Sequence, residues 1–151
     1  MSKNAGSVRW MMLVLLAGTA GSIAIPGTSS AQEFPREGNP AIANGVAGPF
    51  AGRWWIGFPE GEGMINGEPV VDCSSGVELV PQGDAFLLYR SPTGNEATFE
   101  LVEFSGRTTW LPTYGESTIA VWVDENQFLA YSVDLGTGKA RWEDPRVYRR
   151  C

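Results

Sequence analysis

The chain has 151 residues and a formal net charge of −6, with 43% hydrophobic and 19% charged residues. This composition is typical of one globular domain rather than of a disordered chain. Residues 32–151 carry nine Lys and Arg against 17 Asp and Glu, and a segment this acidic has no basic surface for nucleic acid. The chain has no histidine, which excludes Ser-His-Asp and Cys-His catalysis and His-ligated zinc or haem.

Residues 1–31 have the pattern of a secretory signal peptide. Lys3 and Arg9 form a basic start, an apolar stretch follows, and small residues up to Ala31 precede Gln32. The strongly apolar core spans about eight residues, well short of the ~20 that a membrane-spanning helix needs. We therefore expect cleavage before Gln32 and an exported protein, periplasmic or secreted, with no membrane span after cleavage. An uncleaved membrane anchor is the alternative.

Residues 32–51 are rich in Pro, Gly, Ala and Asn. This composition predicts a flexible N-terminal arm rather than a core element, because Pro and Gly interrupt regular structure. We expect the folded domain to span residues 52–151.

The domain reads as a row of short strands, because turn signals recur roughly every 10–12 residues. Between the turns, apolar and polar residues alternate in residues 53–58, 96–101 and 139–143. On this period-two pattern Trp54, Phe99 and Trp142 point towards the core. Residues 117–123 are apolar on both parities, which predicts a strand covered on both faces. We predict an all-β antiparallel meander of about eight strands, closed into a small barrel. An immunoglobulin-like sandwich is the alternative.

Two cysteines, Cys73 and Cys151, follow the predicted signal peptide. In an oxidising compartment such a pair most simply forms one structural disulfide. A redox-active or nucleophilic thiol is the alternative. Neither cysteine lies in a C-x-x-C spacing, and no histidine is present to lower a thiol pKa, so the structural role is favoured.

Aromatic residues supply the candidate binding surface. Trp55 lies on the opposite face of its strand from Trp54, and Trp122 has the opposite parity to its apolar neighbours. Trp110 precedes a loop that contains Tyr114, where aromatic side chains often lie at a barrel mouth. We expect Trp55, Trp110, Trp122 and Tyr114 to contact a small apolar ligand or a partner protein. Filling of the core is the alternative role for each tryptophan.

Paired acids suggest a weaker, catalytic alternative. The pairs are Glu60 and Glu62, Asp124 and Glu125, and Glu143 and Asp144. Two carboxylates serve many glycosidases, and with carbonyl oxygens they can hold calcium. Each pair lies in or beside a predicted turn, where solvated acids are common. We therefore expect no metal, no cofactor and no enzymatic activity, with a carboxylate-based hydrolase as the alternative.

The triplet Gly52-Arg53-Trp54, which follows an irregular segment, resembles the first-strand signature of lipocalins and the wider calycins. Residues 124–131 are similar to a later lipocalin strand motif, although the Thr-Asp-Tyr triplet is absent. The resemblance implies a basic residue packed over the first-strand tryptophan, here Arg141 or Arg149. It also implies a cysteine that ties the C-terminal segment to the barrel.

The chain is also similar to the small periplasmic metalloprotease inhibitors of bacteria, which are exported barrels with one disulfide and a free N-terminal arm. The leading hypothesis is an exported, non-catalytic binding protein with a calycin-like barrel. The alternatives are a protease inhibitor that acts through residues 32–51 and an accessory subunit of an envelope complex.

Overall fold

The computed structural model describes residues 33–59, 64–65 and 68–151. The signal peptide predicted for residues 1–31 lies outside the described residues. Among the residues that are described, no helix is long and apolar enough to cross a membrane.

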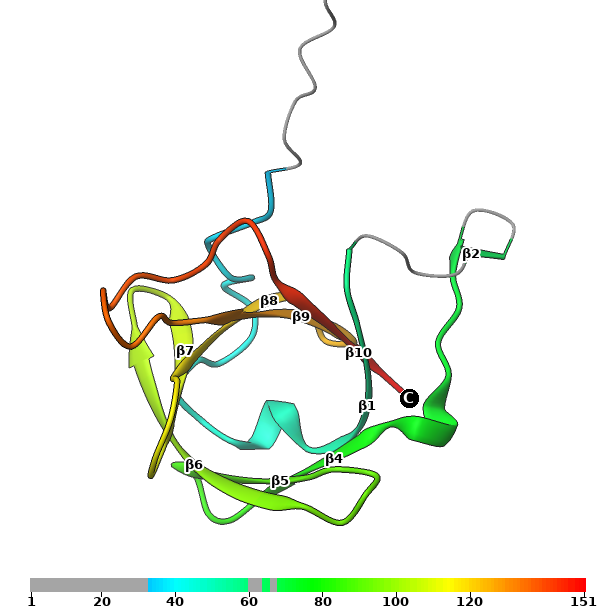
Figure 1. The fold of residues 1–151 in the computed structure, drawn as a ribbon, viewed down its shortest axis with the longest axis horizontal. Coiled ribbons are helices and arrows are strands. Elements are labelled where there is room, and N and C mark those ends of the chain that lie inside the picture. The colour runs from blue at the N-terminus through cyan, green and yellow to red at the C-terminus, as the bar shows by residue number, and fades with distance from the viewer. Residues whose placement is uncertain (1–32, 60–63, 66–67) are drawn as a thin grey trace, which may run out of the picture. The chain divides into compact units, whose positions relative to one another are not determined.

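An eight-stranded antiparallel barrel forms the body of the protein (Figure 1). Its strands are β1 (Gly52–Gly57), β4 (Val77–Pro81), β5 (Phe86–Arg90), β6 (Glu96–Phe104), β7 (Arg107–Pro112), β8 (Thr118–Asp124), β9 (Gln127–Ser132) and β10 (Arg146–Arg150). From β4 to β10 each strand pairs with the next along the chain, and β1 pairs with both β4 and β10, which closes the ring. The predicted all-β closed barrel is confirmed, and the sandwich alternative is excluded.

Besides the eight barrel strands, the described residues form a small sheet and two 3₁₀ turns. A two-stranded sheet pairs β2 (Met64–Ile65) with β3 (Glu68–Pro69). A 3₁₀ turn, η1 (Gly48–Phe50), precedes β1, and a second, η2 (Cys73–Ser75), precedes β4. The Asp72 carboxylate accepts a hydrogen bond from the Ser74 amide, 2.9 Å away, and this contact begins η2.

Side chains fill the interior of the barrel. The strand registers bring alternate residues of each strand to the inner face. The largest buried aromatic side chains of this inner cluster are Phe50, Trp54, Trp110, Trp122, Phe128 and Tyr148. Their rings form edge, tilted and stacked contacts with one another, with centroids 4.5–6.1 Å apart. The interior is therefore a packed aromatic core.

The segment before β1 closes one end of this barrel. Phe50 of η1 is 0% exposed and packs edge-on against Trp110 and Phe128 inside the ring. Its carbonyl accepts a hydrogen bond from the indole Nε1 of Trp54, 2.7 Å away, so a buried N–H is satisfied. In the view of Figure 1, η1 (cyan) lies within the outline of the ring of strands.

Residues 39–47 run across the same end. The Asn39 amide donates to the Trp122 carbonyl at 2.8 Å, and the Ala47 amide donates to the Asp84 carbonyl at 2.7 Å. Between them, the Gly45 amide donates to the Thr108 hydroxyl at 2.9 Å. The Pro- and Gly-rich composition led us to expect a flexible arm in residues 32–51. The structure differs, because this backbone bonds to the turns of the barrel and its buried Ala47 and Phe50 belong to the core.

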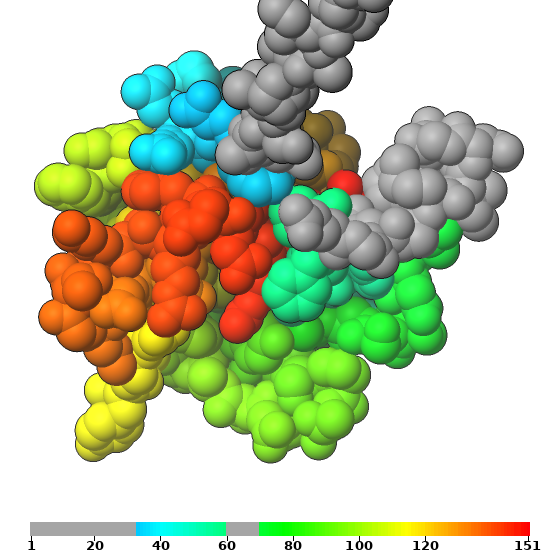
Figure 2. All heavy atoms as spheres, turned by 45° about the horizontal axis from the view of Figure 1, so that its top comes forward, coloured from blue at the N-terminus to red at the C-terminus, as the bar shows by residue number. Residues whose placement is uncertain are grey.

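The outer face of β8, β9 and β10 carries a second apolar cluster. Val121, Leu129, Tyr131 and Val147 are buried there. The partly buried side chains of Phe34, Ile119 and Trp142 pack against them. The Tyr131 hydroxyl donates to the Pro35 carbonyl at 2.6 Å, which fixes the start of the arm on this face. In Figure 2 the blue-to-cyan arm lies beside the orange segment that precedes β10.

Trp142 belongs to this outer cluster, and its predicted place in a core strand is wrong. Residues 139–143 form no strand. Ala140 alone among them pairs with the barrel, through an isolated antiparallel bridge to Val133. The Trp142 ring packs on Tyr131 with centroids 4.8 Å apart. The guanidinium carbons of Arg36 and Arg107 lie 5.6 Å and 5.2 Å from its centroid, so two cations flank this indole.

The disulfide predicted between Cys73 and Cys151 is confirmed, with Cα atoms 5.7 Å apart. It joins η2 to the residue after β10. The Cys151 amide also donates to the Arg53 carbonyl at 2.9 Å. The guanidinium of Arg53 donates to the Cys73 carbonyl at 2.8 Å, so β1 contacts both halves of the bridge.

Arg150 is the basic residue that packs over the first-strand tryptophan. Its guanidinium carbon lies 4.2 Å from the centroid of Trp54. The expectation that Arg141 or Arg149 has this role is wrong. Arg149 lies over Trp55 instead, at 5.5 Å, and Arg141 forms ion pairs in an exposed loop. The side chain at 150 has the same parity as Trp54, its register partner, and is therefore on the inner face.

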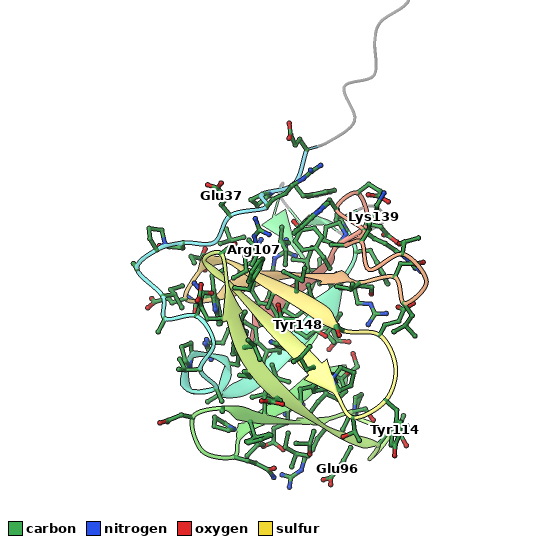
Figure 3. All side chains as sticks on the ribbon, turned by 90° about the vertical axis from the view of Figure 1, so that its left-hand side faces the viewer. Glu37, Glu96, Arg107, Tyr114, Lys139 and Tyr148 are labelled. Atoms are coloured by element: carbon green, nitrogen blue, oxygen red, sulfur yellow. A yellow bond between two sulfur atoms is a disulfide. The ribbon has the colours of Figure 1, made fainter. Side chains whose placement is uncertain are left out.

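The opposite end of the barrel is open. The arm approaches one end in Figure 3, and the labels Glu96 and Tyr114 lie at the other. The β5–β6 turn, the β7–β8 loop and the segment between β9 and β10 surround this end, which we call the mouth.

Candidate binding site at the barrel mouth

A cavity of about 260 Å³ opens at the mouth. Inner-face residues of β5, β6, β7, β8 and β10 line it: Tyr89, Ala97, Phe99, Trp110, Thr118, Arg146 and Tyr148. Each of them comes within a few residues of the point where its strand reaches the mouth. The cavity lies above the packed aromatic core and does not extend through it, since Phe50 fills the other end.

Aromatic rings form the floor and wall of this cavity. Phe99 lies between Tyr89 and Trp110, with centroids 6.5 Å and 5.6 Å away respectively. Trp110 contacts Tyr148 edge-on at 6.1 Å. The Trp110 indole is 2% exposed, so the surface that it offers to the cavity is held in place by close packing on its other sides.

One cation lies at the rim. Arg146 is exposed and takes part in none of the ion pairs formed by the described residues. It shares the inner parity with Tyr148, two residues later. Burial raises the pKa of Tyr148, against the lowering effect of the Arg146 charge and hydrogen bond. Burial also raises the pKa of Tyr89, again against the Arg146 charge. Both phenols therefore stay protonated at neutral pH.

Two of the four predicted aromatic candidates lie at the mouth. Trp110 lines the cavity directly. Tyr114 lies on the β7–β8 loop beside it and is 90% exposed, so its ring faces solvent. The structure therefore brings Trp110 and Tyr114 to the same end of the barrel, with different degrees of burial.

The other two candidates lie elsewhere. Trp122 is 1% exposed and packs against Phe50 and Trp54 in the core near the closed end, where core filling was its alternative role. Trp55 is half-buried on the outer face of β1 beneath the guanidinium of Arg149. Neither residue lines the mouth cavity.

Sequence reasoning missed most of the residues that line the mouth. Tyr89, Phe99, Thr118, Arg146 and Tyr148 were not among the candidates. Their signal was positional, because each has inner-face parity and lies near a strand end that reaches the same rim. Arg146 and Tyr148 carry the clearest form of this signal, a cation two residues from a tyrosine on one face of the last strand.

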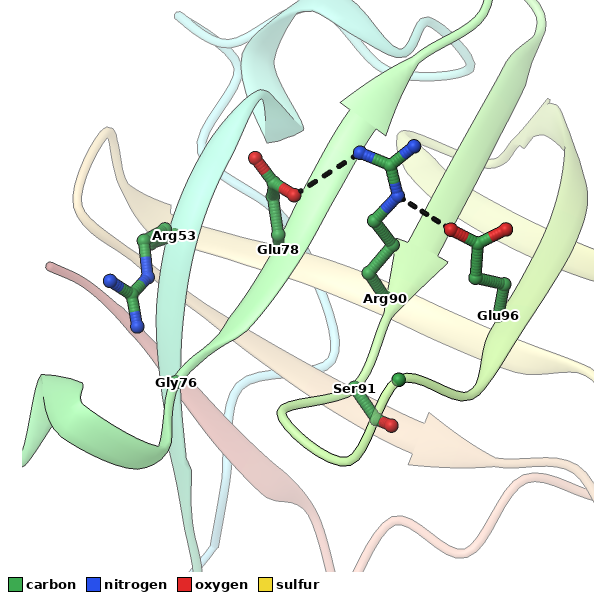
Figure 4. A pocket seen from close by; sticks show the side chains of 7 residues that line it. Arg53, Gly76, Glu78, Arg90, Ser91 and Glu96 are labelled. Carbon is green, nitrogen blue, oxygen red and sulfur yellow. Dashed lines mark hydrogen bonds and ion pairs between the residues drawn. The ribbon is translucent and has the colours of Figure 1, made fainter.

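A second, polar hollow of about 390 Å³ lies on the outer face of β1, β4, β5 and β6 (Figure 4). There Arg53, Glu78, Arg90 and Glu96 stand opposite one another in successive registers. Arg90 bonds to Glu78 at 3.3 Å and to Glu96 at 2.7 Å. Because these exposed charges satisfy one another across the strands, the hollow offers no unpaired group that would select a ligand.

The two acidic pairs that the structure describes do not converge on a site. Glu60 and Glu62 lie outside the described residues. Asp124 and Glu125 are exposed at the β8–β9 turn, where Asp124 accepts a hydrogen bond from the Asn126 amide. The other pair, residues 143–144, is exposed in the segment before β10. Within the described part of the chain, no group of three or more Cys, Asp or Glu side chains could hold a metal ion.

No family model matches the chain, and neither does any curated protein or solved structure. The geometry of the mouth is thus the basis on which a function can be inferred.

Proposed function

We propose that this chain is an exported, non-catalytic binding protein that holds a small, largely apolar ligand in the mouth of a calycin-like barrel. The single observation that carries the proposal is the cavity of about 260 Å³, in which four aromatic side chains meet a few polar groups. Apolar walls with a small number of placed polar groups are the usual composition of a ligand site.

The size of the cavity limits the ligand. Cavities for drug-sized molecules start at roughly 300 Å³, whereas an apolar cavity of roughly 150 Å³ accepts benzene. A volume of about 260 Å³ therefore suits a ligand built around one ring. The ring system of Phe99, Trp110 and Tyr148 offers edges and faces against which such a ring can pack.

Two further features support the wider proposal. The Cys73–Cys151 disulfide favours an oxidising compartment and hence export. The cation of Arg150 over Trp54 agrees with the calycin resemblance, which implies a basic residue at that position. The inhibitor alternative receives less support, because the arm uses its backbone amides at Asn39 and Ala47 to bond to the barrel.

Filling the cavity tests the proposal. Ala97 faces the mouth, whereas Thr98, the next residue, faces outwards and is also exposed. We expect the purified oxidised chain to bind members of a panel of one-ring compounds, measured by ligand-detected NMR and by tryptophan fluorescence. The substitution Ala97→Phe should abolish binding, and Thr98→Phe should leave it unchanged. Absence of binding across the panel, or equal binding by both variants, would contradict the proposal.

A further inference from the structure

The described side chains that line the cavity offer several hydrogen-bond donors. Three of them, Tyr89, Thr118 and Tyr148, bear hydroxyl groups, and Arg146 bears a guanidinium. Among the lining residues that the structure describes there is no Asp or Glu. This contrasts with residues 32–151 as a whole, in which 17 acidic residues outnumber nine basic ones. The described lining therefore offers a ligand the positive charge of Arg146.

The indole N–H of Trp110 adds an unsatisfied donor. Its Nε1 atom is buried and has no hydrogen-bond partner among the described residues. An unsatisfied buried donor costs free energy, of the order of 1–3 kcal/mol. The Nε1 atom of Trp54, by contrast, donates to the Phe50 carbonyl. The Nε1 atom of Trp122 in the core is also buried without a partner among the described residues, so the Trp110 donor is not specific to the cavity and the inference does not depend on it.

Burial keeps the phenols of the mouth in their donor form. The pKa values of Tyr89 and Tyr148 lie above the ordinary range, mainly because both side chains are desolvated. At neutral pH neither group adds a negative charge that would repel an anion.

From these observations we infer that the mouth selects one-ring ligands that carry a carboxylate, and that Arg146 is the side chain that binds the carboxylate. The inference rests on the proposed function and names the ligand class for the same site. Planar guanidinium and carboxylate groups form paired, charge-assisted hydrogen bonds, which are stronger than bonds between neutral groups. The ring of the ligand would then lie against Phe99 and Trp110.

A purely structural role for Arg146 is the competing explanation, because its guanidinium already contacts the Tyr148 hydroxyl. The two explanations differ in what substitution changes. A structural role predicts an altered melting temperature and equal effects on charged and neutral ligands. A ligand-binding role predicts a selective effect on the charged ligand at an unchanged melting temperature.

The test compares phenylacetate with its neutral analogue phenylacetamide, using calorimetry on the full oxidised chain. We expect the wild type to bind phenylacetate roughly tenfold or more tightly than phenylacetamide. Arg146→Gln should remove most of this preference, and Arg146→Lys should restore part of it. The matched control is Arg141→Gln, since Arg141 is also exposed but pairs with Glu116 and Asp134 outside the cavity. This control should keep the preference.

Two results would overturn the inference. One is equal affinity of the wild type for the acid and the amide. The other is an Arg146→Gln variant that retains the preference or melts well below the wild type. The amide and the acid could bind with equal affinity while Ala97→Phe abolishes the binding of each. In that case the proposed function survives and only the selectivity for carboxylates fails. If neither compound nor any other member of the panel binds, the proposed function itself fails.

Discussion

The guanidinium carbon of Arg150 lies over the indole of Trp54, 4.2 Å from the ring centroid. The same guanidinium donates to the carbonyls of Pro49, Ala51 and Glu125 at 2.7–3.0 Å. One side chain therefore ties the last strand of the barrel to its first strand, to η1 and to the β8–β9 turn.

Replacement of the half-buried Arg150 should destabilise the protein more than replacement of an exposed arginine such as Arg141. We expect Arg150→Ala to lower the free energy of unfolding by about 2–3 kcal/mol, because a cation–π contact and several charge-assisted bonds are lost together. Arg150→Lys should recover part of the loss, since a lysine keeps the charge without the planar fork. Urea unfolding followed by tryptophan fluorescence measures both.

The control for this prediction is Arg141→Ala. The ion pairs of Arg141 are long, at 3.5 Å, and its side chain is 48% exposed, so the expected loss is below about 1 kcal/mol. Equal losses at positions 141 and 150 would show that the contact with Trp54 contributes little.

Phe50 should be essential to the stability of the barrel although it precedes the first strand. Phe50→Ala removes a ring that is 0% exposed and leaves a cavity among Trp110, Trp122 and Phe128, at an expected cost of about 3–5 kcal/mol. Thermal and urea unfolding of the variant provide the measurement. Phe104→Ala is the control, because that ring is 70% exposed and its removal should cost less than about 0.5 kcal/mol. Comparable effects at the two positions would contradict a plugging role.

The Cys73–Cys151 disulfide should stabilise the protein by constraining the unfolded chain. The cysteines are 78 residues apart, and the double variant Cys73→Ser/Cys151→Ser should unfold with a free energy lower by about 2–5 kcal/mol. Hydrogen exchange should quicken first at the Cys151 amide, which bonds to the Arg53 carbonyl beside the bridge. Reduction of the disulfide in the wild type should lower the free energy of unfolding by a similar amount. A melting temperature that reductant leaves unchanged would contradict a stabilising role of the disulfide.

Tyr131 should make the protein lose stability at alkaline pH. Burial raises the pKa of Tyr131 to about 12, whereas a tyrosine in the unfolded chain titrates near 10. Below pH 10 both states hold the proton and the contribution is constant. Between pH 10 and 12 only the folded state holds it, so the free energy of unfolding falls by about 1.4 kcal/mol per pH unit for this group. Unfolding curves across this pH range measure the slope.

Substitution of Tyr131 separates its contribution from those of the other tyrosines. Tyr131→Phe also removes the hydrogen bond to the Pro35 carbonyl, so its stability at neutral pH should fall by about 1 kcal/mol and its alkaline slope should become shallower. Tyr114→Phe, at a 90% exposed position, should change neither quantity. An alkaline slope that is unchanged in Tyr131→Phe would contradict the assignment.

The barrel could be predicted because its signal is local. Period-two alternation predicted that Trp54 and Phe99 point towards the core, and both point inwards in the structure. Alternation cannot identify the inner face of a strand when both of its faces are covered. Trp122 and Val121 are adjacent and both buried, one inside the barrel and the other beneath Phe34 and Trp142. The sequence of β8 alone does not distinguish the two faces.

The remaining differences come from contacts between distant segments. Pro and Gly in the arm indicate few local bonds, but the amides of Asn39 and Ala47 bond to carbonyls of residues 122 and 84. Apolar and polar residues alternate in 139–143 as in a strand. A turn precedes this segment and Pro145, which cannot donate a ladder hydrogen bond, follows it, so the pairing is limited to the single bridge at Ala140. Most residues that line the mouth were not predicted, because an excess of tryptophan gives no indication of a cation such as Arg146 on an inner face.

The pairing of β1 with β10 has a consequence for biosynthesis. The ladder that joins Trp54 to Arg150 links residues near opposite ends of the folded domain, so its contact order is high and its formation is intrinsically slow. During translation, β1 and β9 are made before β10 exists, so the edge of each strand that pairs with β10 has no partner. A nascent chain that has not reached Val147 thus presents two unpaired strand edges, which are templates for aggregation. Closure of the ring can therefore follow only after synthesis of the last strand, and premature truncation should yield insoluble material.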